Sequence, residues 1–152
     1  MLAKNTYSEI FKLTPLPIAV LLVKDEGIIV SEANMAYLNF LQFNEKKVLG
    51  ANFISLLHSV SEQSGLIQDS IFSAVKKKET NSIQATFAQG SYQCKIDHIP
   101  VINENGEIDI ILHIVNPITE QNNTTHNLLS SIISNTEEAF IVLNQELIIT
   151  AF

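Results

Sequence analysis

Two histidines and the single cysteine stand at spacings that could bring their side chains together. Residues 92–99 alternate between apolar and polar side chains, which predicts a strand with Cys94 and His98 on one face. In a second predicted strand, residues 108–115, His113 shares a face with apolar neighbours. Imidazole and thiol groups can hydrogen-bond a ligand, bind a metal or act in catalysis. With one cysteine, however, neither a disulfide within the chain nor a thiolate zinc cluster can form.

The acidic residues show no spacing typical of a general acid–base pair or a metal cage. The sequence therefore predicts no catalytic site and no metal site, and we expect this chain not to be an enzyme.

Composition and charge exclude several kinds of partner. The 152 residues are 46% hydrophobic, enough for a folded core, and the formal net charge is −7. All nine basic residues are lysine and none is arginine, which argues against binding nucleic acid or an anionic membrane. The N-terminus lacks a signal-peptide pattern, and no apolar run approaches the ~20 residues that span a bilayer. We therefore expect a cytoplasmic protein.

The first half of the chain predicts a helix, two strands and further helices. A capping box at residues 6–9 starts an amphipathic helix that ends before Pro15. Residues 18–23 and 28–30 then form a predicted hairpin, and helical turns follow as far as Gly50. A second capping box, residues 59–62, should begin the longest helix. One side of that helix carries Ile67, Ile71, Ala74 and Val75, and it ends in Lys76, Lys77 and Lys78.

The second half of the chain predicts three more strands. Residues 82–88 and 92–99 alternate on either side of a Gln89-Gly90 turn, and the second of these strands should end before Pro100. After a turn at residues 103–106, residues 108–115 are nearly all apolar, which predicts a central strand covered on both faces. This order predicts an α+β domain with an antiparallel sheet.

Residues 14–120 resemble a PAS domain. The resemblance rests on an ordered set of short segments, none of them specific alone: Pro17 to Val23, Gly27-Ile28-Ile29 into Ala33-Asn34-Met35-Ala36, Val48-Leu49-Gly50, Phe53 to His58, the long helix, Ile99-Pro100-Val101, Asn105-Gly106-Glu107 and Pro117-Ile118-Thr119-Glu120. It implies a five-stranded antiparallel sheet with short helices and one long helix on one face, preceded here by the N-terminal amphipathic helix.

The resemblance also implies that the histidine-bearing faces point inward, toward a pocket between the sheet and the long helix. The candidate pocket residues are Phe53, Leu57, Phe72, Val75, Cys94, Ile96, His98 and His113. Two interpretations stay open. The histidines are core residues satisfied by the backbone or by each other, or His98 or His113 hydrogen-bonds a small ligand.

Known PAS cofactors can be tested against the residues that bind them. Light-sensing flavin members carry an Asn-Cys pair in the helix after Gly50, whereas residues 51–55 contain no cysteine. Haem members commonly place a histidine ligand in the long helix, and residues 62–79 contain none. The sequence therefore argues against photoactive flavin and haem, and it leaves the cofactor unknown.

The family usually closes its last strand with Asp-Ile-Thr, and here Pro117 replaces the aspartate. We expect Pro117, Thr119 and Glu120 to couple the sheet to the outgoing chain, with a stiffer bend at the proline.

The chain after this junction resembles the start of a second copy, and the alternative is an unrelated apolar hairpin. A shift of 120 residues aligns Ala19 with Ala139, Glu26 with Glu146 and Ile28 with Ile148. The expected organisation is an N-terminal helix (1–14), a PAS domain (15–120), and a linker helix with a truncated second PAS-like domain (121–152).

These features imply a sensory or signal-relay domain of a bacterial two-component protein, such as a sensor histidine kinase acting in a phosphorelay. We expect a homodimer formed through Tyr7, Ile10 and Phe11, a small-molecule ligand, and an output domain beyond Phe152. The alternatives are a ligand-free dimerisation module, a PAS domain of a cyclic-dinucleotide or transcriptional regulator, and, most weakly supported, a cofactor-bearing enzyme domain.

Overall fold

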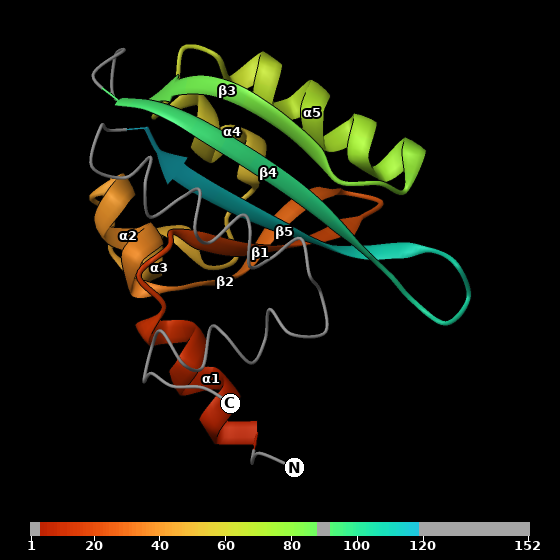
Figure 1. The fold of residues 1–152 in the computed structure, drawn as a ribbon, viewed down its shortest axis with the longest axis horizontal. Helices are drawn as coiled ribbons and strands as arrows, with labels where there is room; N and C mark the ends of the chain where they lie inside the picture. The colour runs from red at the N-terminus through yellow and green to blue at the C-terminus, as the bar shows by residue number, and fades with distance from the viewer. Residues whose placement is uncertain (1–3, 88–91, 119–152) are drawn as a thin grey trace. The chain divides into compact units, whose positions relative to one another are not determined.

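Five helices and five strands make up the part of the chain that the computed structural model describes, residues 4–87 and 92–118 (Figure 1). The helices are α1 (Lys4–Leu13), α2 (Met35–Leu41), α3 (Glu45–Val48), α4 (Phe53–His58) and α5 (Ser64–Lys77). The strands are β1 (Ile18–Lys24), β2 (Gly27–Ala33), β3 (Asn81–Phe87), β4 (Tyr92–Ile102) and β5 (Ile108–Pro117). The predicted order of helices and strands is confirmed, although α1 begins before the capping box proposed for it.

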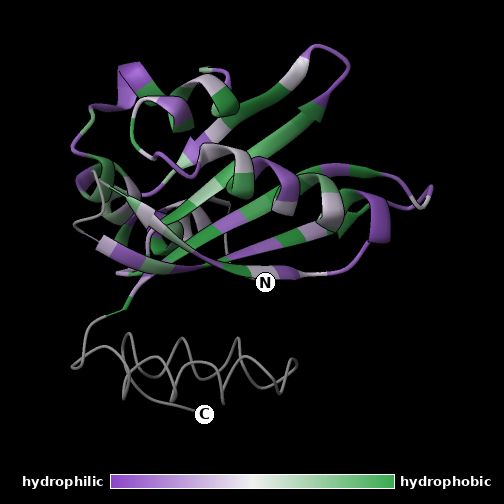
Figure 2. Ribbon diagram, turned by 90° about the horizontal axis from the view of Figure 1, so that it is seen from above, coloured by the Kyte–Doolittle hydropathy of each residue, from purple (hydrophilic) through white to green (hydrophobic). Residues whose placement is uncertain are grey.

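The strands form one antiparallel sheet in the order β2-β1-β5-β4-β3, with β5 in the centre as predicted. Helices α2 to α5 contact the strands and cover one face, and hydrophobic residues line the strands beneath them (Figure 2). On that face of β5, Ile111, His113 and Val115 are buried, whereas the alternate residues are only half-buried. The prediction that both faces are covered was therefore wrong for the second face, which an antiparallel sheet can leave accessible.

A buried asparagine joins the entry segment of the domain to the first strand and to α2. The Asn34 side-chain amide donates to the carbonyl oxygens of Leu16 at 2.7 Å and Thr14 at 3.2 Å. Its Oδ1 accepts from the backbone N–H of Ile18 at 3.1 Å and of Tyr37 at 2.9 Å, the latter an N-cap interaction. All four hydrogen-bonding positions of the side chain are satisfied, so Asn34 holds Tyr37 in register with β1.

The capping box predicted for the long helix does not form. Helix α5 begins at Ser64, and its N-cap residue Gln63 makes no side-chain capping bond. Instead the Ser61 hydroxyl donates to the carbonyl oxygen of Thr86 at 2.7 Å, and Gln63 Oε1 accepts from the Thr86 N–H at 2.7 Å. The polar residues before α5 therefore anchor the α4–α5 connection to β3, a long-range contact that a local pattern does not report.

Strand β4 does not stop before Pro100 but continues to Ile102. Its pairing with β3 ends at His98, which lies opposite Asn81, the first residue of β3. Pro100 lies beyond this point and pairs only with β5, so its missing N–H removes no hydrogen bond to β3.

Several expectations fall outside the described residues: the turn at Gln89-Gly90, the coupling residues Thr119 and Glu120, and the second PAS-like copy at 121–152. None of the described helices is long and apolar enough to cross a membrane.

Candidate functional site

A polar row crosses the inner face of the sheet. Asn81 of β3 lies opposite His98 of β4, and His98 lies opposite His113 of β5. The next partner of His113 is Ala19 of β1, which pairs in turn with Ala33 of β2. The alternation predicted that both histidines face inward. The cross-strand register then brings them together although fifteen positions separate them in the sequence.

These side chains form a continuous chain of hydrogen bonds with the long helix. Asn81 Nδ2 donates to the Ser70 hydroxyl oxygen at 2.8 Å, and Ser70 Oγ lies 2.7 Å from His98 Nδ1. His98 Nε2 lies 2.9 Å from His113 Nδ1. Two arrangements of protons satisfy every link. In the first, Ser70 donates to His98 Nδ1 and His98 Nε2–H donates to His113 Nδ1; in the second, both of these bonds run the opposite way. Both histidines are neutral in either arrangement, and His113 Nε2 is a donor in the first and an acceptor in the second.

The chain of hydrogen bonds ends inside the core on a nitrogen without a partner. Among the described residues, nothing accepts from or donates to His113 Nε2, and the same holds for the buried Tyr37 hydroxyl. The His113 ring stacks on His98 with centroids 5.0 Å apart and meets the edges of Phe53 at 4.8 Å and Tyr37 at 5.6 Å. The interior thus holds two buried polar atoms, from β5 and α2, that have no hydrogen-bond partner among the described residues.

Burial keeps both histidines uncharged at neutral pH. Desolvation lowers the pKa of His98 to about 4, against a smaller opposing effect of Asp97. Desolvation, and then the neighbouring His98, lower the pKa of His113 well below its ordinary value. Burial alone raises the pKa of the Tyr37 hydroxyl, which therefore stays protonated. The site can accept and donate hydrogen bonds, but it carries no charge.

Cys94 lies on the same face of β4 and is buried. Burial raises the pKa of its thiol to about 11, and the one hydrogen bond that the thiol makes with the described residues is a weak one from Sγ to the Tyr92 carbonyl oxygen at 3.9 Å. A protonated, enclosed thiol is a poor nucleophile. In the described ranges no three His, Cys, Asp or Glu side chains are grouped so that they could hold a metal ion.

Of the other predicted pocket residues, four lie in or against the core and one is exposed. Phe53, Leu57 and Ile96 are buried in the core, and Val75 packs against it. Phe72 does not line the interior, since 51% of its side chain is exposed. The buried positions of α5 follow the face that contains Ile71, and the next residue along a helix points about 100° away from that face.

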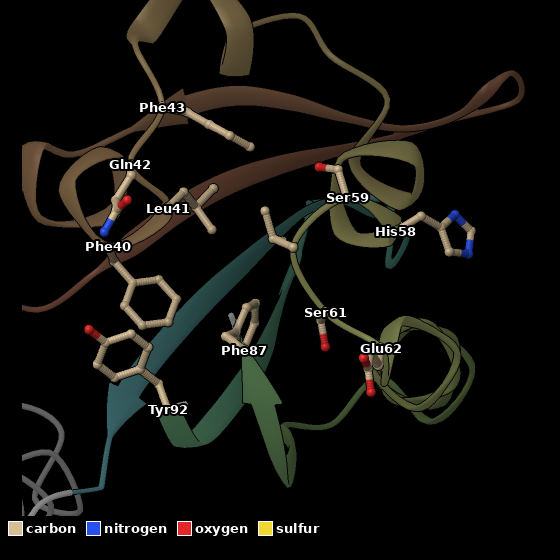
Figure 3. Close-up of a pocket in the computed structure, with 11 residues that line it drawn as sticks. Phe40, Leu41, Gln42, Phe43, His58, Ser59, Ser61, Glu62, Phe87 and Tyr92 are labelled. Carbon is tan, nitrogen blue, oxygen red and sulfur yellow. The ribbon is translucent and has the colours of Figure 1, made fainter. Parts of the chain in front are cut away.

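A surface groove of about 520 Å³ opens near the ends of α2, β3 and β4 and the α4–α5 connection (Figure 3). Its walls include Phe40, Phe43, Phe87 and Tyr92, and none of the predicted pocket residues lines it. The groove was missed because these aromatic residues come from three separate elements. Their only local signal is the spacing of Phe40 and Phe43.

The residues proposed for dimer contacts lie on α1, which contacts α2. Tyr7 is 47% exposed, and Ile10 and Phe11 are half-buried. Pro117 is the last residue of β5 and lies opposite Cys94. Their roles in dimerisation and coupling remain predictions.

Known proteins resemble this chain in structure. No family model matches the sequence, and no curated protein sequence matches it. The sensory box sensor histidine kinase from Vibrio cholerae superposes with a TM-score of 0.57 at 14% identity, covering 76% of this chain and 92% of the other. A PAS domain from Colwellia psychrerythraea gives a TM-score of 0.59 at 16% identity, covering 76% and 97%. The LOV protein of Rhodobacter sphaeroides gives 0.65 at 13% identity, covering 99% and 85%.

Because the sequence identities are this low, the comparisons show the fold and nothing more specific. The five-stranded antiparallel sheet with its helices on one face is the α+β fold of PAS and LOV domains, as the sequence predicted.

Proposed function

We propose that this chain is a sensory or signal-relay PAS domain of a multidomain bacterial signalling protein, such as a sensor histidine kinase, and that it binds a small neutral molecule in its interior. One observation supports this most: the polar chain from Asn81 to His113 ends on a buried ring nitrogen, His113 Nε2, without a partner among the described residues, and the same holds for the hydroxyl of Tyr37, whose ring lies 5.6 Å from that of His113. We infer that this nitrogen carries its proton. A ligand with a hydrogen-bond acceptor would satisfy the His113 N–H and the Tyr37 O–H together. A charged ligand would lose its hydration without gaining a counter-charge.

The same contacts offer a route for the signal. A ligand on His113 acts on β5, the strand that ends at Pro117 where the chain leaves the sheet. Through His98 and Ser70 it would also act on α5, and through Asn81 on β3. Binding shifts the domain between two states only as far as its affinity for them differs. In this proposal the two affinities differ because the ligand accepts hydrogen bonds from two donors, the His113 N–H and the Tyr37 O–H.

The test is native mass spectrometry of the purified full chain, followed by identification of any compound released on denaturation. The informative variant is Tyr37→Phe, which removes one buried hydroxyl and little else. Tyr92→Phe is the matched control, because Tyr92 is half-exposed and lies in the surface groove. We expect a small compound with wild type and with Tyr92→Phe, and much less with Tyr37→Phe. Equal amounts from all three proteins, or none, would refute a ligand site at Tyr37.

A second candidate function is ligand-free dimerisation through α1. It is favoured by the exposure of apolar side chains on that helix, 47% for Tyr7 and 78% for Leu13. Analytical ultracentrifugation of the full chain carrying Tyr7→Ser and Phe11→Ser separates the two candidates. Dissociation of a dimer with no retained compound supports dimerisation alone, and an unchanged assembly excludes α1 as the interface.

A further inference from the structure

The surface groove contains an aromatic cluster that is distinct from the buried histidine site. The ring of Phe40 lies 5.1 Å from that of Phe87 and 6.3 Å from that of Tyr92, tilted by 73° and 58°. Tyr92 remains 50% exposed, and the three rings gather on one side of the groove in Figure 3. Phe87 is only 2% exposed, so Phe40, which is half-buried, and Tyr92 supply most of the aromatic surface that is open to the groove.

Some of the polar side chains around these rings already have hydrogen-bond partners in the described part of the chain, and others do not. The Ser59 hydroxyl donates to the Leu56 carbonyl oxygen at 2.6 Å, and Ser61 is bound to Thr86. The side chains of Gln42 and Glu62, by contrast, make no hydrogen bond or ion pair with the described part of the chain. Both line the groove, which therefore includes an amide and a carboxylate among its described residues.

The position of Glu62 is fixed by its neighbours. Ser61 and Gln63 on either side are both hydrogen-bonded to Thr86 of β3, the residue before Phe87. The backbone at Glu62 is therefore held against β3, and its side chain is exposed and lines the same groove as the aromatic cluster. Among the described residues that line the groove, Glu62 is the one acid and none is lysine.

The rim of the groove already holds one cation on a ring. Lys47 Nζ lies 3.5 Å from the centroid of Phe43, which also lines the groove. This contact occupies Phe43, and Phe87 is buried in the core, so the rings of Phe40 and Tyr92 are left for another partner. An anionic ligand would meet the Glu62 carboxylate in a chain of net charge −7 without any arginine.

We propose that this groove binds a small organic cation, a primary or methylated ammonium carried on an apolar body. Its apolar part packs against Phe40 and Tyr92, and its charge lies between these rings and the Glu62 carboxylate. The volume of about 520 Å³ is in the range of small-molecule sites. This site goes beyond the proposed interior sensor, since neither His113 nor Tyr37 lines the groove.

The test compares four probes of one shape on the full ¹⁵N-labelled chain: phenethylammonium, phenethyltrimethylammonium, neutral 2-phenylethanol and the anion phenylacetate. Amide chemical shifts give the dissociation constant and the place of binding. We expect both cations to bind about threefold or more tightly than the alcohol, the phenylacetate to bind most weakly, and the shifts to centre on residues 40–43 and 60–62.

Glu62→Gln should weaken binding of both cations by about two- to fivefold and leave the alcohol unchanged. The matched control Glu79→Gln makes the same change beyond the other end of the 14-residue α5 and should alter nothing. Tyr92→Leu should weaken the binding of both cations more than Glu62→Gln does. Equal affinity for cation and alcohol, unchanged selectivity in Glu62→Gln, no binding of any probe, or shifts centred on His98 and His113 would each overturn the proposal.

Discussion

Lowering the pH from about 7.5 to about 5 should destabilise the domain through its buried histidines. Burial lowers the pKa of His98 from 6.5 to about 4, so the unfolded chain holds the proton more tightly than the folded one. The stabilisation from a neutral buried His98 is complete above about pH 6.5 and falls as the pH drops from 6.5 toward 4. His113, whose pKa is also lowered, adds a loss of the same sign.

The magnitude follows from the linkage between proton binding and folding. Each pH unit below 6.5 removes about 1.4 kcal/mol per buried histidine, so His98 alone removes about 2 kcal/mol by pH 5. That is a large part of the roughly 5–15 kcal/mol that stabilises a small domain. The loss should appear as a lower urea midpoint with little change in slope.

Urea denaturation followed by circular dichroism suits a chain without tryptophan. Carboxylates also begin to titrate in this range, so the informative quantity is the difference between wild type and His98→Gln. The variant should lose about 2 kcal/mol less stability between pH 7.5 and 5, whatever its stability at pH 7.5. His58→Gln, which changes a surface histidine, should match wild type. Equal losses in wild type and His98→Gln would refute the assignment of the pH dependence to the buried pair.

Four further predictions concern single side chains. Asn34→Ala should lower the free energy of unfolding by about 3 kcal/mol, because two carbonyl groups and an N-cap lose their partner; a loss below about 1 kcal/mol in urea denaturation would contradict this. Ser70→Ala leaves His98 Nδ1 unpaired and should cost about 1–2 kcal/mol in the same assay, whereas no change would show that the link is unimportant. Iodoacetamide should alkylate Cys94 only after unfolding, because burial raises the pKa of the thiol to about 11; rapid labelling of the folded chain, detected by mass spectrometry, would be inconsistent with its burial. Phe72→Ser should change stability by less than about 1 kcal/mol, whereas Ile71→Ser should cost about 3 kcal/mol or more, and similar losses would place Phe72 in the core.

The strands and their inner faces could be predicted because alternation is a local property. The spacing that places Cys94 and His98 on one face also predicts which side chains of β4 are buried. The helix periodicity likewise identified Ile67 and Ile71 on the buried face of α5. The prediction that Phe72 also faces the interior was wrong.

The rest of the site depends on contacts between distant residues. Nothing near Ser70 indicates that its hydroxyl meets His98, twenty-eight residues away. Asn34 could have been identified as an N-cap from its place before a helix, but its bonds to Thr14 and Leu16 depend on how the entry segment folds back. Ser61 lies within a local capping pattern, residues 59–62, but its hydroxyl bonds to the part-buried carbonyl oxygen of Thr86 in β3.

The imidazole ¹H–¹⁵N spectrum of the full chain at neutral pH tests most directly whether the interior presents free donors to a ligand. We predict that His98 and His113 are both neutral and protonated on Nε2. Addition of N-methylacetamide, a small neutral acceptor, should shift the His113 Nε2–H signal in wild type and less in Tyr37→Phe. A charged histidine, a proton on His113 Nδ1, or a His113 signal that does not respond to the probe would contradict the proposed site.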